Sequence, residues 1–113
     1  MDISKEKRGS VTILRPTGQL DLFSAKELRN EVQELVRQGI TKLIVDFESI
    51  SYLDSSGVGA LLHIYSTAKS GAFALRFANV GGPVAHVIEL TKLTDYFPIA
   101  ETVETAQQEL DSC

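Results

Sequence analysis

The apolar run Leu43-Ile44-Val45, followed by Phe47, is the feature that most limits how this chain can fold. A short and nearly continuous run of this kind is typical of a strand that is covered on both faces. An amphipathic helix precedes it, and the strand-like residues Val11, Ile13 and Leu14 precede that helix. Strand, helix and strand in succession form a crossover unit, so we expect two parallel strands in one sheet.

The helix inside this unit has recognisable ends in the sequence. Ser24 with Glu27 matches a capping box, and Phe23 can pack on Leu28 as a hydrophobic staple. We therefore expect the helix to begin at Ser24. Gly39 follows the last apolar residue of the repeat and is expected to end the helix.

The remaining pattern predicts a single α/β domain over residues 1–113. Its expected architecture is a mixed open sheet of about four to five strands with about four helices packed on it. Beyond the crossover unit, the expected elements are strands at 3–7, 72–78 and 98–100, and helices at 56–69, from 81 onward, and at 102–110. The strand at 3–7 and the strand from Val11 flank Gly9-Ser10 and should form an antiparallel hairpin. Residues 50–53 are expected to lead out of the sheet.

The helix at 56–69 is expected to bury one stripe and to approach its neighbours closely. Its expected buried residues are Val58, Leu61, Leu62 and Tyr65. The small residues Gly59 and Ala60 would allow a strand or another helix to come near.

Asp54-Ser55-Ser56-Gly57, directly before this helix, is the part of the sequence most informative about function. Serine side chains often cap helices, and either hydroxyl could do so here. The free N–H groups and the helix dipole at the same place also favour an anion, so a phosphorylated serine could be tolerated. Local pattern alone leaves both interpretations open.

Composition and charge exclude several classes of protein. The chain has a formal net charge of −4 with acidic and basic residues mixed throughout, which argues against nucleic acid as a partner. No apolar run is long enough to span a bilayer, and residues 1–7 do not resemble a signal peptide, so we expect a cytoplasmic protein with no membrane partner. The single cysteine, Cys113, is expected to be a free terminal thiol.

The known catalytic motifs are also absent. Leu62 stands where a dinucleotide fingerprint starting at Gly57 needs glycine or alanine, and no Gly-Lys-Ser/Thr phosphate loop occurs. Asp54 stands where a nucleophile elbow around Ser56 needs glycine. His63 and His86 fall on different helices and are expected at the surface. We expect no catalytic residue, no metal site and no cofactor, and therefore no enzyme.

Three segments together resemble a bacterial anti-sigma-factor antagonist, the stand-alone form of the STAS domain. The first is Gly18-Gln19-Leu20-Asp21 before a Glu- and Leu-rich helix. The second, and the most specific, runs from Leu43 to Asp46-Phe47 and from Leu53 through Asp54-Ser55-Ser56-Gly57 to Gly59. The third is Leu93-Thr94-Asp95-Tyr96-Phe97-Pro98-Ile99. The similarity covers nearly the whole chain.

The resemblance implies a regulatory role for the motif. In that family the unphosphorylated antagonist binds an ATP-dependent serine kinase that is also an anti-sigma factor, and the sigma factor is released. The kinase phosphorylates the serine before the glycine, here Ser56, and a metal-dependent serine phosphatase reverses the step. Asp54 and Ser55 would flank the phosphorylation site, and Asp21 would be a nearby recognition residue.

The strand ends suggest how these residues lie together. Asp21 and the loop from Asp54 to Gly57 both leave the ends of strands in one sheet, so we expect them to be close, with Leu22 exposed beside them. The predicted partner-binding residues are therefore Asp21, Leu22, Asp54, Ser55, Ser56 and Gly57. Two alternatives stay open at this point: a soluble STAS-like subunit of a transport or lipid-trafficking complex, and a small-molecule sensor that uses the fold as a pocket.

Overall fold

A computed structural model describes residues 1–112, so the expectation for Cys113 lies outside the described residues. Within that range the chain forms six strands and four α-helices. Their bounds are β1 (Asp2–Arg8), β2 (Val11–Leu20), α1 (Leu22–Arg37), β3 (Lys42–Asp46), β4 (Ile50–Leu53), α2 (Ser55–Thr67), β5 (Ala74–Ala78), α3 (Gly82–Leu90), β6 (Ile99–Ala100) and α4 (Val103–Asp111). A short π-helical turn, Ala68–Ala72, extends α2.

The strands form one mixed sheet in the order β1-β2-β3-β5-β6. β1 and β2 are an antiparallel hairpin, and β2 is parallel to β3 across the crossover through α1, as the sequence predicts. The expected α/β class and the short edge strand β6 are confirmed.

The sheet has one strand more than the upper end of the expected range, and that strand is β4. Residues 50–53 do not leave the sheet, because they pair in parallel with the second half of β2. The register of this pairing shifts between Gly18 and Gln19, where Gly18 adopts a positive φ of 107°. β2 therefore pairs with β3 through its first residues and with β4 through Gly18–Leu20. Such a bulge bends a strand and redirects its pairing.

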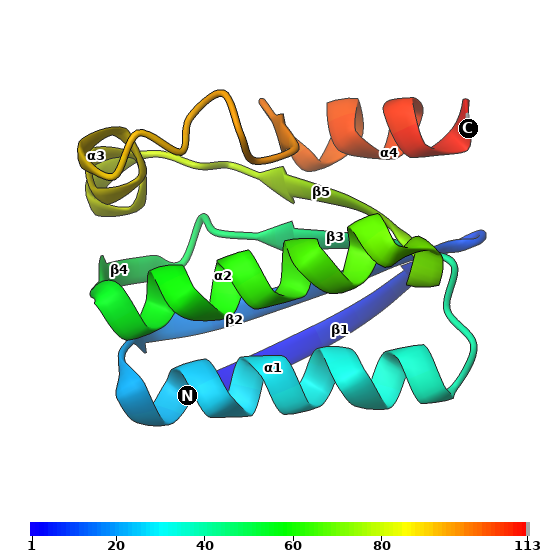
Figure 1. Cartoon of the computed structure of the whole chain (residues 1–113). Coiled ribbons are helices and arrows are strands. Elements are labelled where there is room, and N and C mark those ends of the chain that lie inside the picture. The colour runs from blue at the N-terminus through cyan, green and yellow to red at the C-terminus, as the bar shows by residue number, and fades with distance from the viewer. Residues whose placement is uncertain (113) are drawn as a thin grey trace.

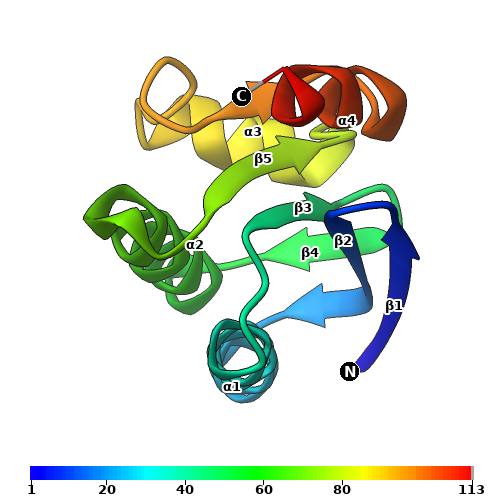
Figure 2. The same ribbon diagram turned by 90° about the vertical axis from the view of Figure 1, so that its right-hand side faces the viewer.

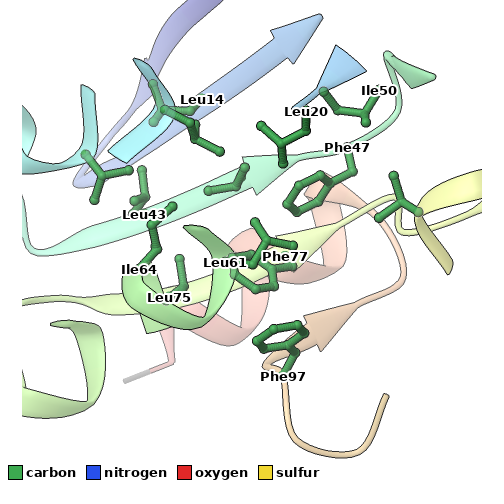
Figure 3. Close-up of a cluster of buried hydrophobic side chains, with 14 of the residues drawn as sticks. Leu14, Leu20, Leu43, Phe47, Ile50, Leu61, Ile64, Leu75, Phe77 and Phe97 are labelled. Atoms are coloured by element: carbon green, nitrogen blue, oxygen red, sulfur yellow. The ribbon is translucent and has the colours of Figure 1, made fainter. Parts of the chain in front are cut away.

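Helices cover both faces of the sheet. Figures 1 and 2 show α1 and α2 side by side on one face, with α4 on the other, where it contacts β2, β3 and β5. The main core lies between the sheet, α1, α2 and α3, and a smaller one lies under α4. Within the main core, Phe77 packs edge-on against both Phe47 and Phe97, with 5.3 Å between ring centroids in each pair (Figure 3).

α1 begins two residues earlier than the sequence suggested, at Leu22. Its capping box consists of Asp21 and Ser24, so the expected box of Ser24 with Glu27 is wrong. Phe23 then lies in the first turn with 77% of its surface exposed and does not act as a staple. Ser24 is buried instead. Residues for both capping boxes are present in the sequence. The earlier box, Asp21 with Ser24, forms because β2 ends at Leu20.

The buried face of α2 also differs from the expected stripe. Val58 and Leu61 are buried as expected, but Leu62 is 38% exposed, Tyr65 is half-buried, and Ile64 takes their place in the core. The glycine that allows close approach is Gly57, whereas Gly59 is exposed with open space around it. A Cβ on Gly57 would lie 2.6 Å from the carbonyl oxygen of Leu20 and would also overlap Cδ1 of Leu53.

These two glycines make a matched pair for a stability test. Gly57→Ala should lower the free energy of unfolding by about 1–3 kcal/mol, because the new methyl group meets the backbone of β2. Gly59→Ala should instead raise it by about 0.5–1 kcal/mol, because alanine favours the helix and nothing is in its way. Urea denaturation of the two variants measures both effects. A tolerated Gly57→Ala would contradict the close packing of α2 on β2.

Candidate functional site

The ends of β2 and β4 bring two capped helix starts to one edge of the sheet. Leu20 pairs with Leu53 at the ends of these parallel strands, and the Asp54 N–H approaches the Leu20 carbonyl oxygen at 3.4 Å. Asp21 and Asp54 follow directly and cap α1 and α2. Figure 1 shows both helices beginning at the same end of the molecule. We call the residues Asp21, Leu22, Phe23 and Asp54 to Ser56 the switch edge.

Asp21 is held firmly by the first turn of α1. Its Oδ1 accepts hydrogen bonds from the backbone N–H groups of Phe23 at 3.0 Å and Ser24 at 3.1 Å. The Ser24 hydroxyl accepts from the Asp21 N–H at 2.8 Å and donates to the Gln19 carbonyl at 2.6 Å. The pKa of Asp21 is lowered below its ordinary value. The main cause is the hydrogen bond from the Ser24 N–H, and the Ser24 hydroxyl and the Phe23 N–H make smaller contributions. Asp21 therefore has a structural role as a cap, beside the recognition role that the resemblance implies.

Asp54 caps α2, so neither of the two serine hydroxyls that could cap this helix does so. Its Oδ1 accepts from the N–H groups of Ser56 at 2.9 Å and Gly57 at 3.1 Å. The N–H groups that were expected to favour a phosphate thus already bind a carboxylate. An anion added to either serine meets this negative charge instead of an unoccupied helix N-terminus.

Both serine hydroxyls of the motif are free. Ser55 is exposed and Ser56 is half-buried. Neither hydroxyl forms a hydrogen bond with any of the residues 1–112 that the structure describes. Both are thus available for modification, and exposure alone does not select Ser56. Gly57 is buried against Leu20 and Leu53, so its clearest role is the close packing of α2.

Exposed apolar side chains belong to the same two chain segments as Asp21 and the serines. Leu22 is 57% exposed, as the sequence reasoning expected, and Phe23 is exposed still further. Phe23 was missed as a surface residue because it was assigned to a staple, and the Asp21–Ser24 capping box is the signal that could have revealed it. Tyr52, at 47% exposure on β4, adds a third large side chain just before Asp54. Exposed groups of this kind near one another are typical of protein interfaces.

Two features considered from the sequence, a metal site and a membrane-spanning helix, are absent from the described residues. Among residues 1–112, no group of three or more His, Cys, Asp and Glu side chains could hold a metal ion. In the same range, no helix is long and apolar enough to cross a lipid bilayer. His63 on α2 and His86 on α3 are both exposed, which confirms their expected surface positions.

Comparison with known proteins places this architecture among characterised relatives. The chain is 24% identical over 112 residues to an anti-sigma F factor antagonist of Paenibacillus polymyxa, covering 98% of this chain and 96% of the relative. It is 28% identical over 91 residues to an anti-sigma-B factor antagonist of Bacillus subtilis (strain 168), covering 80% of this chain and 83% of the relative.

A solved structure shares the same fold over almost its whole length. It is the anti-sigma factor antagonist SpoIIAA in its unphosphorylated form, with a TM-score of 0.80, 25% identity, and coverage of 99% of this chain and 98% of that one. A model of the STAS domain family matches residues 2–106. This match confirms the family resemblance seen in the sequence: the chain belongs to the STAS domain family.

Proposed function

We infer that this protein is an anti-sigma-factor antagonist that phosphorylation of Ser56 switches off. In its unphosphorylated form it binds an anti-sigma factor that is also a serine kinase, and the sigma factor is released. A serine phosphatase restores the binding form. The protein acts in the cytoplasm as a regulator, without an activity of its own. The observation that carries this proposal is the switch edge, where paired strand ends are followed by a motif with two free serine hydroxyls and by a helix turn with exposed apolar side chains. The names of its relatives support it.

The apolar part of the switch edge supplies the contact surface. Leu22 and Phe23 project from the first turn of α1, which the Asp21 capping box holds in place. Apolar anchors on a rigid element lose little conformational freedom on binding, and a few such residues usually carry most of the affinity. The partner is expected to cover them together with the unmodified Ser56.

Charge explains how a phosphate would end this interaction. A phosphoserine carries roughly −1.5 to −2 charges at neutral pH. At Ser56 it would join the carboxylate of Asp54, whose hydrogen bonds already occupy the start of α2. Desolvating such a group against a poorly matched partner costs several kcal/mol. A cost of about 4 kcal/mol lowers affinity about a thousandfold.

The alternative of a transport or lipid-trafficking subunit shares the fold but gains no support from the switch edge. A subunit of such a complex would bind its partners equally well whether or not Ser56 is phosphorylated. The proposed function requires the opposite, and the following predictions separate the two.

The two serines should differ in labelling. Incubation with the cognate kinase and ATP should phosphorylate the wild-type protein and Ser55→Ala, but not Ser56→Ala. Both substitutions remove a hydroxyl without a hydrogen-bond partner among residues 1–112, so both variants should fold normally and serve as controls for each other. Mass mapping of the phosphate gives the answer. Phosphate found on Ser55 would overturn the assignment.

The apolar anchors should matter for binding and not for folding. Leu22→Ala and Phe23→Ala should each weaken binding to the anti-sigma factor about tenfold, which corresponds to about 1.4 kcal/mol. Their melting temperatures should change little, because both side chains are mostly exposed. Leu28→Ala, buried on the same helix, is the contrasting variant and should lose about 2–5 kcal/mol of stability. A large loss of stability in Leu22→Ala would identify Leu22 as a core residue.

The switch should act locally. Comparison of amide chemical shifts before and after phosphorylation should show changes around Asp21 and Ser56 only, because the strand ends behind them are fixed by the core residues Leu20 and Leu53. Ser56→Asp adds a single charge and fewer oxygens, so it should weaken binding less than the phosphate does. Changes spread over all helices, with binding retained, would refute the mechanism.

A further inference from the structure

A groove between α1 and α2 lies away from the switch edge. The two helices run side by side from a common end (Figure 1), and the groove of about 280 Å³ lies between the second half of α1 and the later residues of α2. Val32, Val36 and Ile64 contribute its apolar surface. Val32 and Ile64 are almost fully buried, so of these three residues Val36, which is half-buried, offers the most surface to a ligand.

Every ionisable side chain that lines this groove is basic or neutral. Arg29 and Arg37 on α1 and His63 on α2 contribute to its walls, and none of the lining residues is acidic. This is unexpected in a chain whose formal net charge is −4. Because Arg37 is paired with Glu34, the unbalanced positive charge of this lining is that of Arg29.

Of the two arginines that line the groove, Arg29 is the one whose side chain has no partner among the described residues. Arg37 forms an ion pair with Glu34, which does not line the groove. Arg29 is half-buried, yet its guanidinium group forms no ion pair or hydrogen bond with another of the residues 1–112 that the structure describes. A guanidinium group beside apolar side chains and without a counter-charge is well suited to a carboxylate, which it can bind through two parallel hydrogen bonds.

We propose that the groove binds a small amphipathic carboxylate with a medium-length alkyl chain. The alkyl chain packs mainly on Val36, above the buried Val32 and Ile64, and the carboxylate binds Arg29. The combination of apolar surface with a few placed polar groups is that of small-molecule sites, and the volume lies just below their usual range of about 300–1,000 Å³. The site is separate from Ser56, and its existence does not depend on the proposed function.

Titration of the full chain with sodium decanoate, kept below its micelle concentration, tests the proposal. Decanoate should bind with a dissociation constant of roughly 0.1–1 mM. It should shift the amide resonances of residues 29–37 and 60–67. Decanol and the decyltrimethylammonium cation have the same chain length without the carboxylate. Each should bind at least about fivefold more weakly, because neither can pair with Arg29.

Two variants assign the contacts. Arg29→Gln should weaken decanoate binding about tenfold, whereas Lys92→Gln, which removes one positive charge after α3, should leave it unchanged. Val36→Glu adds a carboxylate to the groove lining and should abolish binding. If this variant does not fold, Arg29→Gln alone tests the contact. Equal affinity for decanoate and decanol, an unchanged affinity in Arg29→Gln, or resonance shifts elsewhere in the chain would each overturn the proposal.

Discussion

The first turn of α2 packs closely on the end of β2, and the switch edge depends on this packing. The Leu20 carbonyl oxygen lies so near Gly57 that no side chain fits between them. The same strand end pairs with Leu53 of β4. Together these contacts make the two chain segments leave the sheet at one place. The switch edge is therefore built on buried backbone, which gives its exposed side chains a rigid base.

The two aspartates at this edge, Asp21 and Asp54, both stabilise a helix start and place negative charge there. Each caps a helix through its carboxylate, so each is held in a fixed position by backbone N–H groups. This arrangement satisfies donors that a helix start otherwise leaves unpaired. It also means that the helix N-terminus of α2 is not a vacant anion site. Under the proposed function, a phosphate on Ser56 adds to charge that is already present, which favours loss of a partner over binding of a new one.

Much of the fold could be predicted from the sequence because periodicity reports which side of an element is buried. The β1–β2 hairpin, the crossover through α1, and the edge strand β6 all follow from local patterns. β4 could not be predicted in this way, since four residues with both ends buried show neither period two nor a continuous apolar run. Its strand character depends on the bend of β2 at Gly18, which local pattern does not specify.

The α/β class, the family and the motif that contains the free hydroxyls could be inferred from the amino-acid sequence alone. Tertiary contacts were needed to show which residue caps each helix, that Gly57 and not Gly59 meets β2, and that Phe23 is exposed. They were also needed to show that Arg29 lies beside an apolar groove without a counter-charge. The physical reason is common to all of these. A sequence pattern specifies the period of a helix, whereas the residue at which the helix starts, and hence the direction in which each side chain points, depends on where the preceding strand ends against its neighbours.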